Sequence, residues 1–232
     1  VDADYEQGVS DYIDRALSDP GYIALVDGFA ERAIHLGAYY SIALKVLHIL
    51  SPGVPDIYRG AELWETSLVD PDNRRPVDYG LRRALLEDVR GASPETLFEA
   101  RGTGAAKLWL IQRLLRIRRD FLSGLKEGWR LEFMACDGLH AESLLAFALK
   151  DRKERVRLAV LAAYRVSELP GESRGLTIDP SLWGGTLVTL PDVFHRKTLR
   201  NLITDGTVKA EGREASVAAL LNGLPVGIFA PE

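Results

Sequence analysis

Cysteine is almost absent from this sequence of 232 residues, in which Cys136 is the only one. A single cysteine excludes an intrachain disulfide framework and a cysteine-rich zinc site, because both need several thiols. Histidine is scarce as well, and no two of the four histidines stand at the H-x-H or H-E-x-x-H spacing. The sequence therefore predicts no metal site built on these residues.

The sequence also lacks an excess of positive charge. It has 29 lysines and arginines against 33 aspartates and glutamates, a net charge of −4. A general nucleic-acid surface needs a clustered basic face, so we expect no nucleic-acid partner.

Long apolar runs are missing too. No run approaches the roughly 20 residues that span a bilayer, so we expect no membrane partner. The first five residues, VDADY, have neither a basic region nor an apolar stretch, and we expect a cytoplasmic protein without a secretory signal. The missing initiator methionine is explained by a removed tag or methionine, or by a chain that is a piece of something longer.

Apolar periodicity divides the chain near residue 124. The composition, 47% hydrophobic and 27% charged, is typical of globular proteins. Before residue 124 apolar residues recur at helical spacing, and after it short apolar runs alternate with turn residues. Helices are expected at 9–17, from Pro20 after the N-cap Asp19, and at 38–50, 80–89 and 105–121. Strands are expected at 129–135, 143–149, 157–163, 186–189, 199–204 and 226–230.

The segment between the third and fourth helices is unusual. Two prolines and a glycine in 51–55 end the helix, and Asp56–Arg59 is a possible short strand. A polar stretch, 60–79, follows; loops of this length are usually functional or disordered. A lone strand needs a sheet partner, which residues 1–50 do not offer. Either the chain begins with a helical domain and this strand is mistaken, or the partner sheet lies outside this sequence.

Two adjacent motifs in this segment carry a resemblance. Residues 52–62, PGVPDIYRGAE, are similar to the G-x-P-x-I-Y-x-G-x-E segment of the α-amylase superfamily, which forms strand eight of a (β/α)8 barrel and the loop after it. The continuation, 63–78 or LWETSLVDPDNRRPVD, closely resembles the maltooligosyl trehalose synthases, the (1→4)-α-D-glucan 1-α-D-glucosylmutases of that superfamily. The resemblance covers essentially the whole chain, which is similar to the C-terminal third of such an enzyme.

The resemblance implies an intramolecular transglycosylation with retention. Enzymes of this family turn the reducing-end α-1,4 linkage of a maltooligosaccharide into an α,α-1,1 linkage. A carboxylate nucleophile forms a glycosyl-enzyme, and a second carboxyl group acts first as acid and then as base. All the family's catalytic carboxylates precede strand eight, and no His-Asp pair occurs in this chain. We therefore assign none of them here and expect this chain to be inactive in isolation.

Substrate positioning is what remains for this chain. In related enzymes an arginine just ahead of the loop proline closes the sugar pocket, and Arg74 or Arg75 matches it, with Arg74 the better alignment. Guanidinium groups suit sugar hydroxyls and carboxylates. The alternative is a structural arginine that ties the loop to Asp70 or Asp72. These two aspartates are more typical of turns than of a catalytic pair.

Three further residues are candidates for sugar contact. Tyr58 and Trp64 have aromatic faces on which glucose rings pack, although core packing explains them equally well. Glu62 either accepts a hydrogen bond from a sugar hydroxyl or orients Arg59. The arginines of the 105–121 helix are interpreted as a solvated face.

The predicted architecture is α/β followed by all-β. Residues 1–123 are expected to supply the last helices and strand eight of a catalytic (β/α)8 barrel, and residues 124–232 a C-terminal β-sandwich domain. The expected partners are the missing N-terminal part of the barrel, a maltooligosaccharide and a trehalose-releasing trehalohydrolase; no cofactor is implied. Two alternatives stay open: another amylase-family α-glucosidase or transglycosidase, and a non-catalytic carbohydrate-binding module.

Overall fold

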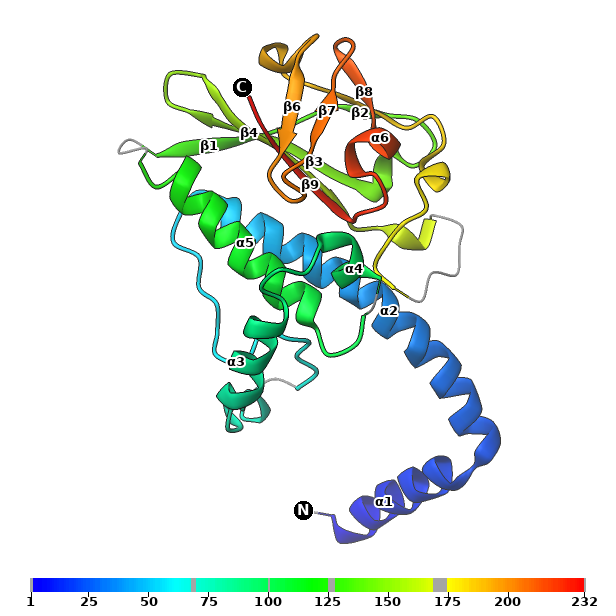
Figure 1. Ribbon diagram of the computed structural model, residues 1–232. Coiled ribbons are helices and arrows are strands. Elements are labelled where there is room, and N and C mark those ends of the chain that lie inside the picture. Colours follow the sequence, from blue (N-terminus) through cyan, green and yellow to red (C-terminus); the bar gives the residue numbers. More distant parts are fainter. Residues whose placement is uncertain (1, 68–69, 100, 125–127, 169–174, 232) are drawn as a thin grey trace. The chain divides into compact units, whose positions relative to one another are not determined.

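The computed structural model describes residues 2–67, 70–99, 101–124, 128–168 and 175–231, apart from the side chains of Asp72 and Glu168 (Figure 1). The chain divides into two compact units, Val1–Gly37 and Ala38–Glu232. The boundary predicted near residue 124 is a different division, and it stays a prediction. It coincides with the observed change from helices to strands.

The first unit is built of helices whose ends are set by aspartates. Helix α1 (Ala3–Ser18) begins after Asp2, whose carboxylate accepts a hydrogen bond from the Tyr5 backbone N–H at 3.1 Å. Asp19 caps helix α2 (Pro20–Leu50) in the same way, as predicted, by accepting from the backbone N–H of Gly21 at 2.7 Å. Helix α1 buries none of its side chains.

Helix α2 is longer than the sequence suggested, because two predicted stretches join into one helix. No proline interrupts residues 21–50, and its C-terminal part lies in the second unit. That part buries Ala38, Tyr39, Ile42, Ala43, Val46, Ile49 and Leu50. By length and composition alone α2 could cross a membrane, since an 18-residue window has a mean hydropathy of 1.3. Core helices of soluble proteins have the same property, and the expectation of no membrane partner stays a prediction.

The predicted strand Asp56–Arg59 does not form. Residues 54–58 have no regular structure, and a turn begins at Arg59. The Asp56 backbone N–H instead donates to His48 Nε2 at 3.3 Å. The physical reason is the one that made the strand doubtful: a strand needs a neighbouring strand to pair its backbone groups.

Three more helices belong to the second unit: α3 (Tyr79–Asp88), α4 (Pro94–Phe98) and α5 (Ala105–Phe121). Helices α3 and α5 match their predictions, whereas the five residues of α4 are too few for a detectable apolar period. Ser93 caps α4 through its side chain, with Pro94 in the first turn.

Two antiparallel sheets follow. A six-stranded sheet has the order β1-β3-β4-β9-β6-β7 and a three-stranded sheet the order β2-β5-β8. The strands are β1 (Trp129–Phe133), β2 (Cys136–Asp137), β3 (Leu144–Asp151), β4 (Val156–Ala163), β5 (Leu187–Thr189), β6 (Thr198–Asn201), β7 (Thr207–Lys209), β8 (Glu214–Ser216) and β9 (Val226–Ala230). Five residues before β9, a short helix, α6 (Val217–Leu221), ends. Helices followed by antiparallel sheets confirm the coarse fold prediction; the short strands β2, β7 and β8 were not predicted.

The core of the second unit centres on strands β4 and β9. Residues 158–163 of β4 are fully buried, and every residue of β9 is buried. Consecutive buried residues mean that both faces of these central strands are covered. In Figure 1, α5 and the C-terminal part of α2 run beneath the larger sheet.

Two arginines of α5 are structural ties, which corrects their interpretation as a solvated face. Arg113 donates to the Leu202 carbonyl at 2.6 Å and pairs with Asp205 at 2.5 Å, in the turn between β6 and β7. Arg118 donates to the carbonyl of Ile49, in the last turn of α2, and to the carbonyls of Ser51 and Gly53, just after the helix. The Ile49 carbonyl is one of those that a helix C-terminus leaves without a partner inside the helix.

Candidate functional site

A polar cavity of about 480 Å³ lies at the loop that carries the resemblance. Its lining comes from the first and last parts of the loop, residues 59–67 and 73–78, and from the first turn of α3. The lining residues are Arg59, Gly60, Glu65, Thr66, Ser67, Asn73, Arg75, Pro76, Val77, Asp78 and Arg82. Guanidinium, carboxylate, hydroxyl and amide groups therefore converge on one hollow, in which hydrogen-bond donors and acceptors alternate.

Arg82, in α3, joins the two ends of this loop. Its Nε donates to Glu62 Oε2 at 2.9 Å, its Nη2 to the Gly60 carbonyl at 2.7 Å, and its Nη1 to the Asp78 carbonyl at 3.0 Å. Both ion-paired side chains are largely shielded from solvent, with 15% of Arg82 and 24% of Glu62 exposed. The guanidinium of Arg82 thus donates three hydrogen bonds to the loop. Glu62 pairs with Arg82, and not with Arg59.

Glu65 is one of the two carboxylates that line the cavity. The backbone N–H of Ser67 donates to its Oε1 at 2.8 Å, and the Ser67 hydroxyl donates to the same oxygen. These bonds hold the pKa of Glu65 below its usual range, because they stabilise the charged form. Glu65 is therefore an ionised hydrogen-bond acceptor at neutral pH.

The predicted arginines separate in the structure. Arg74 forms a two-pronged ion pair with Asp70, with Nε–Oδ1 at 2.5 Å and Nη2–Oδ2 at 2.8 Å, and both side chains are exposed. Arg75 lines the cavity, whereas Arg74 does not. Asp70 is thus a partner of Arg74, as the structural alternative predicted. The side chain of Asp72 lies outside what the structure describes, as do residues 68–69.

The predicted aromatic residues differ from each other. Tyr58 is half exposed and does not line the polar cavity. Trp64 has structural contacts: its indole Nε1 donates to the Arg101 carbonyl at 2.8 Å, and Lys107 Nζ lies 5.5 Å from the centre of its ring. These contacts tie Trp64 to the segment before α5 and to Lys107, and its role as a sugar platform stays a prediction.

A second, smaller cavity of about 230 Å³ adjoins the same ion pair. Glu62, Tyr79, Arg82, Arg83, Leu86 and Leu108 line it. The sequence did not point to Arg82, which borders both cavities, because nothing in its spacing distinguishes it from the other arginines that lie on helices. Its importance follows only from the folding of residues 60 and 62 against α3.

The carboxylates around the polar cavity are engaged in structure. Glu65 is bound by Ser67, and Asp78 caps α3 by accepting from the Leu81 backbone N–H at 2.8 Å. Retaining glycosidases need a nucleophile and an acid held about 5–5.5 Å apart across the scissile bond. This arrangement suits binding and orientation of a polyhydroxylated ligand better than bond cleavage.

The fold resembles that of solved maltooligosyltrehalose synthases. The solved maltooligosyltrehalose synthase from Arthrobacter ramosus matches 98% of this chain with a TM-score of 0.73 and 27% sequence identity, and the match covers 27% of that protein. A hypothetical maltooligosyl trehalose synthase from Sulfolobus tokodaii matches 99% of this chain and 26% of its own length, with a TM-score of 0.59. At 20% identity, the second likeness is one of fold alone.

Comparison of amino-acid sequences gives a relative with higher identity over a shorter stretch. A protein of Mycobacterium tuberculosis named as a putative maltooligosyl trehalose synthase is 44% identical over 92 residues, which are 37% of this chain. No family model matches the chain. The resemblance to the maltooligosyl trehalose synthases is thus confirmed. The matched region is only 11% of the curated relative's length.

Proposed function

We propose that this chain is the part of a maltooligosyl trehalose synthase that holds the sugar next to the reacting linkage. The 44% identity with the mycobacterial relative is the observation that carries this proposal. In it, the reducing-end α-1,4 linkage of a maltooligosaccharide becomes an α,α-1,1 linkage by intramolecular transglycosylation. The nucleophile and the acid/base come from another part of the enzyme, because the carboxylates of the polar cavity are occupied by structural contacts.

The proposed architecture assigns residues 1–123 to the end of a (β/α)8 barrel and residues 124–232 to a β-sandwich that braces it. Active sites of such barrels lie at the C-terminal ends of the strands, where the loop after strand eight would stand. The irregular backbone of 54–58 supports this assignment, since the segment would pair only when the rest of the barrel sheet is present. We further propose a cytoplasmic location and a trehalohydrolase that consumes the product.

In this proposal Arg75, rather than Arg74, contacts the sugar. Arg75 lines the polar cavity, whereas Arg74 does not. A guanidinium and the ionised Glu65 would bracket a glucose unit by donating to and accepting from its hydroxyls. Ser67 and Asn73 add short polar groups to the same lining.

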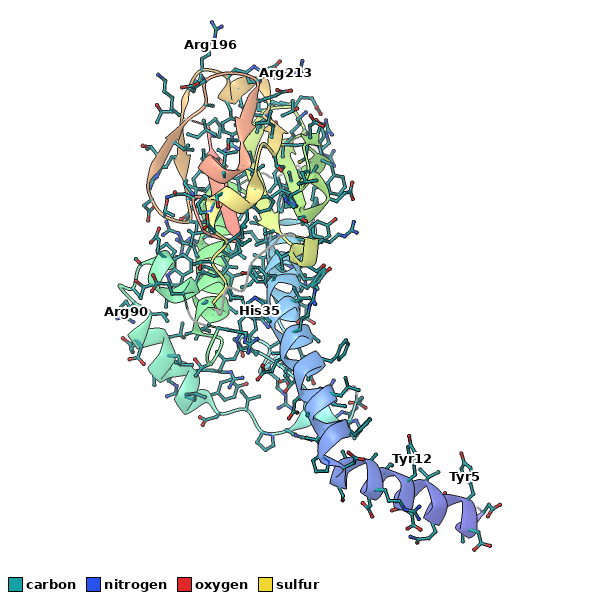
Figure 2. The ribbon with its side chains drawn as sticks, turned by 90° about the vertical axis from the view of Figure 1, so that its right-hand side faces the viewer. Tyr5, Tyr12, His35, Arg90, Arg196 and Arg213 are labelled. Atoms are coloured by element: carbon teal, nitrogen blue, oxygen red, sulfur yellow. The ribbon has the colours of Figure 1, made fainter. Side chains whose placement is uncertain are left out.

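A binding experiment tests this assignment. Maltopentaose is titrated into the chain while the backbone amide resonances of Ser67 and Val77 are followed by NMR. We expect both to shift, and Arg75→Ala to weaken binding about tenfold through loss of charge-assisted hydrogen bonds. The matched control is Arg90→Ala, an exposed arginine beyond α3 that pairs with Glu87 (Figure 2). Equal loss in both variants, or no shift at the cavity, would contradict the proposal.

A parallel activity assay separates binding from chemistry. The chain is incubated with maltopentaose, and reducing ends and free glucose are measured together. We expect neither to change. Loss of reducing ends without matching glucose would show that this chain carries out the conversion itself, and release of glucose would point to an α-glucosidase.

A further inference from the structure

A buried lysine, Lys107, contacts the loop at Leu63, although the two residues are 44 positions apart in the sequence. Lys107, in the first turn of α5, donates from Nζ to the Leu63 carbonyl at 2.8 Å. The same ammonium lies 5.5 Å from the centre of the Trp64 ring, within the range of a cation–π contact. Only 4% of Lys107 is exposed.

Two more contacts from the same region close on Trp64. Its indole donates to the Arg101 carbonyl, just before α5. Gly104, the residue just before α5, has a φ of +89°, and a Cβ atom there would lie 2.8 Å from the Trp64 backbone nitrogen. Only glycine permits this close approach without strain. The start of α5 is therefore shaped around Leu63 and Trp64.

Leu63 and Trp64 stand between two glutamates of the loop. Glu62, on one side, pairs with Arg82, which lines the polar cavity, and Glu65, on the other, lines the cavity with Ser67. A contact that holds the central two residues therefore also limits where Glu62 and Glu65 lie. Lys107 itself does not line the polar cavity, so it would act on the cavity through the loop.

The charges that face Lys107 come from two elements. Lys45, on α2, disfavours its charged form, while Glu65 and Glu62, on the loop, favour it. Burial is the largest influence, and together these effects lower the pKa of Lys107 from 10.5 to about 8. Burying an ammonium group is unfavourable without compensating partners. Here the partners are the carbonyl and the aromatic face of the loop itself.

We propose that Lys107 is a positioning residue, whose hydrogen bond to the Leu63 carbonyl holds Leu63 and Trp64 against α5 and thereby sets the wall of the polar cavity. The proposal rests on the proposed function only for what the cavity binds. Burial disfavours the charged form of Lys107, so the closed loop, which buries this group, is favoured when the amine is neutral. A neutral amine still donates to the Leu63 carbonyl, so the loop should be held more tightly above the transition than below it.

Hydrogen exchange of the Trp64 indole N–H tests this without any sugar. In the full chain this resonance is assigned with Trp64→Phe, and its protection is corrected for the intrinsic pH dependence of exchange. We expect protection to rise as pH increases through about 8. We expect Lys107→Met to be about tenfold less protected at pH 9 than the native chain, and unaffected by pH. The Ser67 amide resonance should move in parallel.

Two controls make the outcome specific. Lys107→Arg keeps its charge at every accessible pH, so the transition should be removed. Lys45→Met leaves the hydrogen bond to Leu63 in place and removes a like charge, so the transition should move to higher pH. Unchanged sheet amides in Lys107→Met show that it folds.

Equal indole protection in Lys107→Met and the native chain would overturn the proposal, as would a Ser67 resonance that ignores both Lys107→Met and pH. Adding maltopentaose to the same samples tests the proposed function separately. A chain that shows the pH transition but does not bind the sugar keeps the positioning role and loses only the proposed ligand.

Discussion

Helices α1 and α5 have nearly the same length, 16 and 17 residues, and opposite fates. Both carry apolar residues at helical spacing, yet α1 buries none of its side chains and α5 buries seven. Tyr12 and Leu17 of α1 are 72% and 62% exposed, whereas Leu110 and Leu114 of α5 are fully buried. Figure 2 shows the labelled Tyr5 and Tyr12 pointing outward from α1. Periodicity therefore predicts a helix, but only a partner makes it part of a core.

The strongest way to sharpen this comparison is to truncate one leucine in each helix. Leu114→Ala should lower the free energy of unfolding of the second unit by about 4 kcal/mol, because it leaves a cavity in a packed core. Leu17→Ala, on exposed α1, should change it by less than about 0.5 kcal/mol. Urea unfolding followed by tryptophan fluorescence measures both. Similar losses would mean that α1 is buried in solution.

The second prediction concerns a charge buried in α5. The pKa of Lys107 is about 8 in the folded chain and near 10.5 when unfolded, so between these values the unfolded chain binds more protons. Stability should therefore rise with pH across this window, by about 3 kcal/mol relative to Lys107→Met. Unfolding of both proteins at pH 7 to 10 measures the difference. Parallel pH profiles would contradict it.

The third prediction compares arginines near the ends of the two helices. Arg118, in α5, donates to three carbonyls at the end of α2 and lies 4.7 Å from the centre of the Trp129 ring. Arg118→Met should cost about 2 kcal/mol, because it leaves carbonyls without donors. Arg15→Met, in the last turn of exposed α1, serves as the matched control and should cost little. Thermal unfolding of the two variants distinguishes them.

The smallest effect is expected at the cap of α1. Asp2→Ala removes the side-chain acceptor for the Tyr5 N–H and should weaken α1 by about 1 kcal/mol. Amide exchange in residues 5–10 should quicken, while the unfolding midpoint of the sheets should not move. A lowered midpoint would show that α1 contributes to the stability of the core.

Within the loop, the sequence indicated the segment that lines the polar cavity, and it indicated only some of the contacts there. Arg75 was among its candidates and lines the cavity; Glu62 was too, although its partner is Arg82. Trp64 was left open between a sugar platform and packing, and its indole donates to the Arg101 carbonyl. Lys107, Arg82 and Gly104 were not singled out, because each gains its role from contacts with residues distant in the chain.

The sequence by itself determined the local elements and the resemblance. Asp19 and Pro20 began α2, apolar alternation marked β3, β4 and β9, and residues 52–78 pointed to the maltooligosyl trehalose synthases, because caps, periods and motifs are encoded within a few neighbouring residues. Tertiary structure alone decided which helix was buried and which arginines hold distant segments together. It also decided that residues 56–59 formed no strand. These outcomes depend on partners far away in the chain, and a strand without a neighbour has nowhere to place its hydrogen bonds.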